Sequence, residues 1–130
     1  ADPTPRYREL HAAAEATFDA VTAVLRHGTT MEAILEATAE IERRGCTICD
    51  DLVHGFGGGY FQPIIGSRSR MAGRGLPQMT LEENMTVVVQ PNPVTTEADG
   101  SKRSGVQVGE LLRITREGCE SLHRLPRGLF

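Results

Sequence analysis

The stretch His54-Gly55-Phe56-Gly57-Gly58-Gly59-Tyr60-Phe61-Gln62-Pro63 decides which fold this sequence predicts. Glycines at this density indicate that the backbone bends tightly or that another group approaches it closely. The spacing fits neither the dinucleotide-binding fingerprint nor the phosphate-binding P-loop, and no helical pattern follows it. The stretch therefore predicts a tight turn that begins with a histidine, and a phosphate-binding role is not expected.

A first helix is predicted near the start of the chain. Thr4 followed by Pro5 has the form of an N-cap and a first helical position. Gly28 is placed to end this helix, which would have about five turns. Apolar residues recur at helical spacing along it, namely Tyr7, Leu10, Ala14, Phe18, Val21 and Leu25.

A second helix is predicted directly afterwards. Thr29 and Glu32 have the spacing of a capping box, in which each side chain satisfies a free backbone donor of the other residue. Gly45 is placed to end this helix. Its buried stripe would be Met31, Ile34, Leu35, Thr38 and Ile41.

Short β-type runs follow the helices. They cover residues 85–89, 106–115 and 119–122, separated by turn signals, while residues 66–77 and 95–104 have the composition of flexible loops. Helices followed by strands, without strict alternation, favour an α+β fold. We expect two N-terminal helices packed on a mostly antiparallel, curved sheet.

Length and charge exclude several classes of protein. The chain of 130 residues fits one domain or part of one, and its net charge of −3 gives no reason to expect nucleic acid or an anionic membrane as partner. No apolar run approaches the roughly 20 residues that span a bilayer. The first residues lack the features of a signal peptide, and three cysteines cannot all pair within one chain. A cytoplasmic location is therefore expected.

The Cys46-Thr47-Ile48-Cys49 pair suggests zinc or redox chemistry, but the context disfavours both. With His54 it has the spacing of a zinc knuckle, whose fourth ligand would fall on Gly59. A thioredoxin-type pair would lie at a strand-to-helix junction, whereas this one follows a predicted helix. Buried structural cysteines are the preferred interpretation.

Three ordered segments resemble those of the creatinase, prolidase and methionine aminopeptidase superfamily. The His54–Pro63 stretch resembles its His-Gly-x-Gly-x-x-x-His-Glu-x-Pro segment, and residues 81–91 resemble its Leu-x-x-Gly-Met-x-x-x-x-Glu-Pro strand. Residues 105–110 resemble Gly-Val-Arg-Ile-Glu-Asp. The resemblance implies a single partial pita-bread domain over residues 1–130, with the N-terminal half of that fold absent.

The resemblance also assigns site positions. His54 stands at a metal-binding histidine, Gln90 replaces one glutamate ligand and Gly109 replaces the glutamate that bridges two metals. Glu110 occupies the next acidic position, but its side chain would point to the opposite face of the strand. Asn84 takes the place of a turn glycine, which asparagine tolerates because it visits positive φ comparatively easily.

The remaining changes affect the ligand pocket and the other metal ligands. Phe61 replaces a histidine that contacts substrate in the superfamily, and Gln62 replaces the glutamate beside it. The two aspartate ligands would lie on a strand before the first helix, which this sequence does not contain. A pair of divalent metal ions needs several carboxylate oxygens, so neither a metal centre nor another cofactor is expected.

Two functions remain open, and whether the chain is an enzyme stays undecided. In the first, a peptidase-like scaffold has lost metal-dependent hydrolysis and binds a small ligand, a peptide end or a partner protein. In the second, a metal-independent hydrolase or lyase resembling creatinase uses His54 as general acid and base, oriented by Gln90 and Glu110. The expected pocket residues are Tyr60, Phe61, Gln62, Gln90 and Glu110.

Partners are expected as well. Half of a pseudo-symmetric sheet exposes a strand edge and apolar faces. We therefore expect a homo-oligomer or association with the missing N-terminal half.

Overall fold

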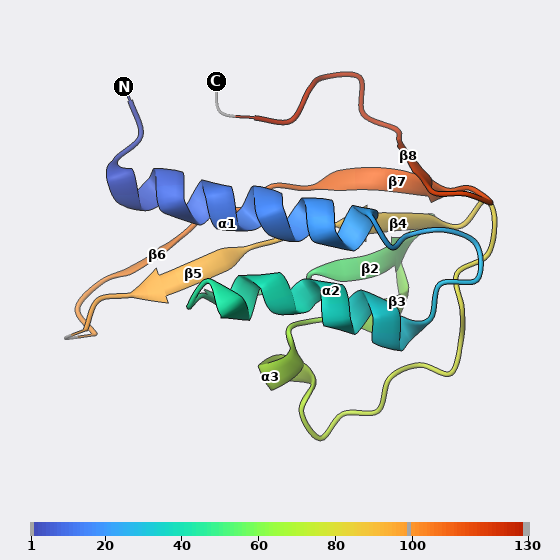
Figure 1. The fold of residues 1–130 in the computed structure, drawn as a ribbon, viewed down its shortest axis with the longest axis horizontal. Helices are drawn as coiled ribbons and strands as arrows, with labels where there is room; N and C mark the ends of the chain where they lie inside the picture. Colours follow the sequence, from blue (N-terminus) through green and yellow to red (C-terminus); the bar gives the residue numbers. More distant parts are fainter. Residues whose placement is uncertain (1, 99, 129–130) are drawn as a thin grey trace.

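Three helices and eight short strands make up the described part of the chain, residues 2–98 and 100–128, in a computed structural model (Figure 1). The helices are α1 (Pro5–Thr22), α2 (Met31–Arg43) and α3 (Arg68–Met71). The strands are β1 (Thr47–Ile48), β2 (Val53–Phe56), β3 (Tyr60–Ile65), β4 (Thr86–Val89), β5 (Pro93–Thr96), β6 (Arg103–Gly105), β7 (Glu110–Ile114) and β8 (Cys119–Ser121).

The strands form two antiparallel sheets. The larger sheet has the order β3-β2-β4-β7-β8, and the smaller has the order β1-β5-β6. Helices α1 and α2 lie side by side along these sheets (Figure 1). The arrangement confirms the predicted α+β fold with two N-terminal helices on antiparallel strands.

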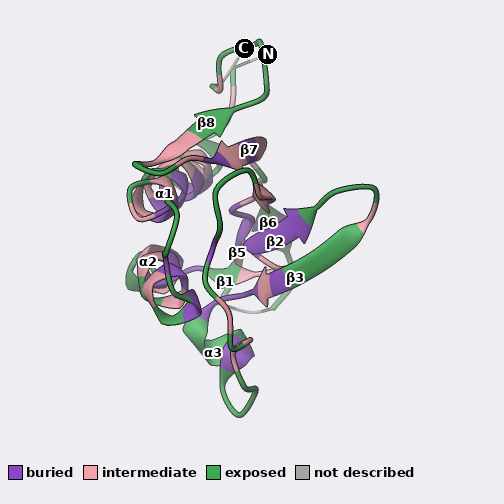
Figure 2. Cartoon of the chain, turned by 90° about the vertical axis from the view of Figure 1, so that its right-hand side faces the viewer, coloured by how far each residue is buried: buried purple, intermediate pink, exposed green. Residues whose placement is uncertain are grey.

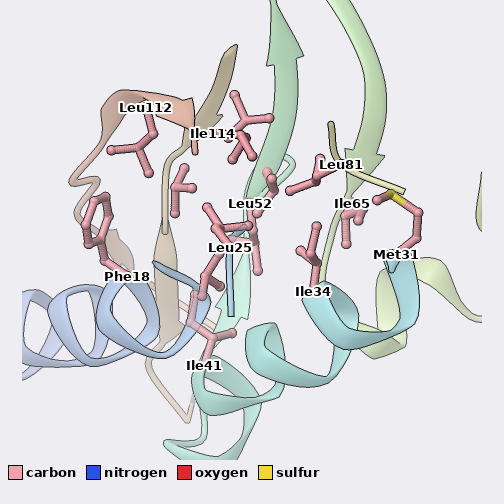
Figure 3. Packing of buried hydrophobic residues seen from close by; sticks show 14 residues of the cluster. Phe18, Leu25, Met31, Ile34, Ile41, Leu52, Ile65, Leu81, Leu112 and Ile114 are labelled. Carbon is pink, nitrogen blue, oxygen red and sulfur yellow. The ribbon is translucent and has the colours of Figure 1, made fainter. Parts of the chain in front are cut away.

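The core lies between the two long helices and the larger sheet. Along β4, Val87 and Val89 are buried while Val88 between them is partly exposed, and on β7 Leu112 and Ile114 are buried. This alternation places one face of the sheet against the helices. Figure 3 shows side chains from helices, strands and connecting segments meeting there, each worth about 1.5–3 kcal/mol when fully buried. The labelled ones are Phe18, Leu25, Met31, Ile34, Ile41, Leu52, Ile65, Leu81, Leu112 and Ile114.

The predicted end of the first helix is wrong by several residues. Helix α1 ends at Thr22, and Gly28 lies in the loop that follows, with a positive φ of 87°. The Gly28 N–H donates to the carbonyl of Leu81 at 2.7 Å. The glycine therefore turns the loop toward the sheet instead of capping the helix.

The predicted capping box is displaced by one residue. Thr30 is the N-cap of α2, and its hydroxyl accepts a hydrogen bond from the Ala33 N–H at 3.2 Å. The Thr29 hydroxyl instead donates to the carbonyl of Val24 at 2.6 Å. Thr29 is thus bonded within the preceding turn, and Thr30 caps the helix.

The predicted strand over residues 106–115 is wrong as a single element. Strand β6 ends at Gly105 in the smaller sheet, and β7 begins at Glu110 in the larger one. Between them, Val106 and Val108 donate backbone hydrogen bonds to Pro93 and Pro91. The segment between them crosses from one sheet to the other, so one stretch of β-type sequence supplies strands to both sheets.

Both segments with loop composition contain regular structure. Residues 66–77 include α3, and residues 95–104 include parts of the β5–β6 hairpin. The strands on either side of the glycine turn, β2 and β3, also lie outside the predicted runs. Asn84 has a φ of 71°, which confirms that asparagine replaces a turn glycine there.

Candidate functional site

The β2–β3 hairpin carries His54 and the glycine-rich turn, and it extends away from the helices (Figure 2). A side-chain Cβ at position 55 would lie 2.4 Å from the carbonyl oxygen of Gln62. Only glycine fits there. Gly58, with a positive φ of 85°, makes the turn itself. These glycines set the close approach of the two strands beside His54.

His54 is almost completely buried, at 5% exposure. Its Nδ1 lies 3.0 Å from the carbonyl oxygen of Gly55. A carbonyl can only accept a hydrogen bond, so Nδ1 carries the proton and Nε2 of the neutral ring is an acceptor. The ring stacks on Tyr60, with centroids 3.8 Å apart and planes 22° apart.

Tyr60 is held over the histidine by an acidic residue. Its hydroxyl donates to Asp51 Oδ2 at 2.9 Å. Tyr60 is half-exposed, but desolvation on its covered side, reinforced by this hydrogen bond to Asp51, raises the pKa of its phenol above the ordinary value. The phenol therefore stays protonated and remains a donor at neutral pH.

Positions 90 and 109 face each other next to the His54 strand. His54 pairs with Val88 across β2 and β4, and Gln90 follows two residues later on the same face. A Cβ at Gly109 would lie 3.2 Å from the Cβ of Gln90. The structure thus brings together three positions that are far apart in the sequence: His54 lies on β2, and Gln90 and Gly109 lie directly beyond the paired ends of β4 and β7.

A hollow of about 400 Å³ lies over positions 90 and 109. Because His54 is one strand away and covered by Tyr60, it adjoins this hollow without lining it. The residues that line the hollow are Val88, Gln90, Gln107, Gly109, Glu110, Leu111 and His123.

Hydrogen bonds fix the carboxamide of Gln90. Its Nε2 donates to the carbonyl of Asp51 at 3.2 Å, and its Oε1 accepts from Gln107 Nε2 at 3.2 Å. Asp51 therefore connects Tyr60, through its carboxylate, with Gln90, through its carbonyl. These hydrogen bonds connect Tyr60, which covers His54, with Gln90 and Gln107 at the hollow.

Asn92 anchors the loop that carries Asp51. It is fully buried, and its Oδ1 accepts from the backbone N–H groups of Cys49 and Asp50 at 2.9 and 3.0 Å. Its Nδ2 donates to the carbonyls of Asp51 and Gln90 at 3.0 and 2.9 Å. Nothing in the sequence pattern marked this residue.

The carboxylate of Glu110 is directed to the helix side of the sheet. Its Oε1 lies 3.7 Å from the Arg127 guanidinium, which also contacts Glu15 and covers the ring of Phe18 on α1. Glu110 shares its strand face with buried Leu112. Glu110 borders the hollow, while its carboxylate contacts Arg127.

Phe61 and Gln62 do not join this hollow. Phe61 is 53% exposed and its ring lies against the turn at Gly59. The carboxamide oxygen of Gln62 accepts a hydrogen bond from the nearby Ile64 N–H at 3.0 Å. Both side chains make their contacts within the hairpin. The pairing of its two strands has a register shift after His54.

His123 is one of the residues at the hollow that the sequence did not indicate. Its Nε2 accepts a hydrogen bond from the Leu111 N–H at 3.3 Å, next to β8. It lines the hollow together with Gln90. The only signal in the sequence is a histidine directly after the predicted strand 119–122, and the register was needed to place it.

The cysteine pair lies at the two ends of β1. Cys46 is buried, burial raises the pKa of its thiol, and Cys49 is exposed. Residues three apart on a strand point to opposite faces about 10 Å apart. Both are free thiols, as is Cys119.

The residues at the superfamily's ligand positions do not fit a two-metal centre. They supply one imidazole, one carboxamide already engaged by Asp51 and Gln107, and a glycine. Within residues 2–98 and 100–128, no three His, Cys, Asp or Glu side chains converge as a metal-binding group. No helix in this part of the chain is both long and apolar enough to span a membrane.

The fold and the order of these positions define a pita-bread, aminopeptidase-type domain, and comparison with known proteins agrees. The sequence profile of metallopeptidase family M24 matches residues 1–116, so the chain belongs to this family. Among curated protein sequences, none matches the chain.

Several solved structures are similar to this chain. X-Pro aminopeptidase from Thermotoga maritima MSB8 is 22% identical with a TM-score of 0.78; the match covers 99% of this chain and 34% of that one. Prolidase from Pyrococcus furiosus is 19% identical with a TM-score of 0.77; the match covers 97% of this chain and 35% of that one. Methionine aminopeptidase from Rickettsia prowazekii is 19% identical with a TM-score of 0.66; the match covers 92% of this chain and 53% of that one. At these identities the likeness shows the fold, and the chain spans about a third of the length of the first two proteins.

Proposed function

We propose that this chain is an M24 scaffold that binds a small ligand, a peptide end or a partner protein and does not carry out metal-dependent peptide hydrolysis. The observation that carries the proposal is the facing pair of Gln90 and Gly109. A pair of divalent ions requires several hard oxygen ligands. Gln90 supplies a neutral carboxamide and Gly109 supplies no side chain, whereas the superfamily has a glutamate at each of these positions.

The surroundings of the hollow support this proposal. The Glu110 carboxylate, the nearest acidic group in the sequence, is engaged by Arg127 on the helix side. The Gln90 carboxamide is held in place by two hydrogen bonds. The hollow therefore has fixed polar groups over an apolar floor, as small-molecule sites generally have.

Hydrolysis assays test the proposal. The purified chain is incubated with Xaa-Pro dipeptides and excess Mn²⁺ or Co²⁺, and release of free amino acid is measured. We expect no turnover above a heat-denatured control. Metal-dependent turnover that disappears in His54→Ala would contradict the proposal.

An alternative is a metal-independent hydrolase or lyase that uses His54 as general acid and base. The observation that favours it is the hydrogen bond from His54 Nδ1 to the Gly55 carbonyl, which fixes the tautomer and leaves Nε2 as a base. Creatine-like and Xaa-Pro substrates are then assayed without metal. Activity in the wild type that is lost in His54→Ala would establish this alternative.

We also propose a protein partner, either a second copy or an M24-type N-terminal half. Phe56, Tyr60 and Phe61 are exposed together on the β2–β3 hairpin, and β3 is an edge strand. Sedimentation velocity at micromolar concentration checks the first option. A dimer is expected, and a monodisperse monomer would exclude self-association.

A further inference from the structure

The hollow beside His54 has an apolar floor. Val88 and Leu111 are cross-strand partners on β4 and β7. Their neighbours Val89 and Leu112 are buried against the helices, so Val88 and Leu111 lie on the opposite face. Gly109 contributes no side chain to this floor.

The rim of the hollow is polar, and its hydrogen bonds fit uncharged groups. Gln90 and Gln107 are neutral, and the one carboxylate at the hollow, Glu110, is paired with Arg127. His123 accepts a hydrogen bond at Nε2, which requires an unprotonated nitrogen there. Among the described lining residues, no unpaired charge is present to neutralise a charged ligand.

The polar groups keep free hydrogen-bonding capacity. A carboxamide has two N–H donors and an oxygen acceptor, and the bond from Gln107 to Gln90 uses one donor of Gln107. The carboxamide oxygen of Gln107 and its second N–H remain. Because Nε2 of His123 accepts from the Leu111 N–H, the ring N–H that can donate to a ligand is at Nδ1.

We propose that His123 is a ligand-binding residue and that the hollow takes a neutral, amide-bearing group, such as a peptide bond or a primary carboxamide, in preference to a carboxylate or an ammonium group. The donor of His123 and the acceptor of Gln107 complement the oxygen and the N–H of an amide. This inference rests on the proposed function, because it names the ligand class of the same hollow.

The preference follows from charge and solvation. Gln107 and His123 are exposed at the rim, so a charged group there loses only part of its water, but over the apolar floor it meets no opposite charge, which is unfavourable. An amide keeps its hydrogen bonds with Gln107 and His123, while an attached apolar side chain covers Val88 and Leu111. The selectivity is therefore against charge at the amide position.

Three matched probes test this preference by NMR. N-acetyl-leucinamide is neutral, N-acetyl-leucine carries a carboxylate and leucinamide carries an ammonium group. Backbone amide shifts of ¹⁵N-labelled protein are followed during titration. We expect saturable shifts at Gln90, Gln107, Leu111 and His123 with the neutral probe, and at least tenfold weaker binding of the other two. Absence of saturable shifts, or equal binding of a charged probe, overturns the proposal.

A matched pair of histidine variants tests the role of His123. His27 also accepts a backbone hydrogen bond, from the Glu83 N–H at 3.2 Å, but it lies near the other end of β7, where its own N–H donates to Thr115. His123→Ala should weaken binding of N-acetyl-leucinamide about fivefold, as expected for one neutral hydrogen bond. His27→Ala should leave binding unchanged. Equal effects of the two variants, or none from His123→Ala, overturn the assignment.

Failure of this inference can be separated from failure of the proposed function. The same wild-type sample is titrated with Mn²⁺ in the absence of any probe. Binding of two ions would overturn the proposed function. If no metal binds and N-acetyl-leucinamide does not bind either, only the ligand class and the role of His123 are wrong.

Discussion

The phenol ring of Tyr60 lies parallel to the imidazole of His54, 3.8 Å away, and its hydroxyl donates to Asp51. This contact explains why His54, although it lies on a protruding hairpin, is only 5% exposed. Any chemistry at His54 Nε2 therefore requires that Tyr60 moves or that the ligand reaches the histidine from the hollow.

Removing the tyrosine ring should uncover His54. In Tyr60→Ala, modification of His54 by diethyl pyrocarbonate should be several-fold faster, and stability should fall by about 1 kcal/mol because the ring stack is lost. Mass spectrometry locates the modification, with the exposed His27 as internal reference. Tyr60→Phe keeps the ring and should stay near the wild-type rate. Equal rates in all three proteins would show that Tyr60 does not cover the histidine.

The approach of the two hairpin strands should depend on Gly55. The Cβ of Gly55→Ala would meet the Gln62 carbonyl at 2.4 Å, so we expect a loss of about 2–3 kcal/mol in the free energy of unfolding. Gly57→Ala is the matched control, because its Cβ has no neighbour nearer than 3.9 Å. Urea unfolding followed by circular dichroism measures both. Similar losses in the two variants would refute the steric explanation.

Removal of the buried Asn92 carboxamide should lower the free energy of unfolding. Asn92→Ala leaves two backbone N–H groups and two carbonyls without their partner, so we expect a loss of about 3 kcal/mol. Asn84→Gly is the control, since glycine accepts the φ of 71° at that position. Urea unfolding again measures the difference. A loss below that of the control would mean that water replaces the Asn92 bonds.

The helices were predictable because their signal is local. Apolar residues three and seven apart, such as Met31, Ile34 and Ile41 in the second stripe, define a buried helix face without knowledge of the rest of the fold. The helix ends were less predictable. Thr30 caps α2 while the Thr29 hydroxyl is bonded to Val24, and the spacing of residues does not distinguish the two threonines.

The site was only partly predictable for the same physical reason. The order of the family segments identified His54, Gln90 and Gly109, and strand pairing brings those positions together. The partner of Glu110 is Arg127, which the folded tail places against α1. His123 reaches the hollow through its bond to Leu111. Such long-range contacts depend on register and tail packing, and neither leaves a local pattern.

Isothermal titration of the wild-type chain with Mn²⁺ or Co²⁺ tests the central claim most directly, namely that this M24 domain holds no two-metal centre. The double variant Gln90→Glu/Gly109→Glu is the matched comparison, because it returns two carboxylates to facing positions next to His54. We expect no stoichiometric binding by the wild type and one ion bound by the double variant. Binding of two ions by the wild type would contradict the account.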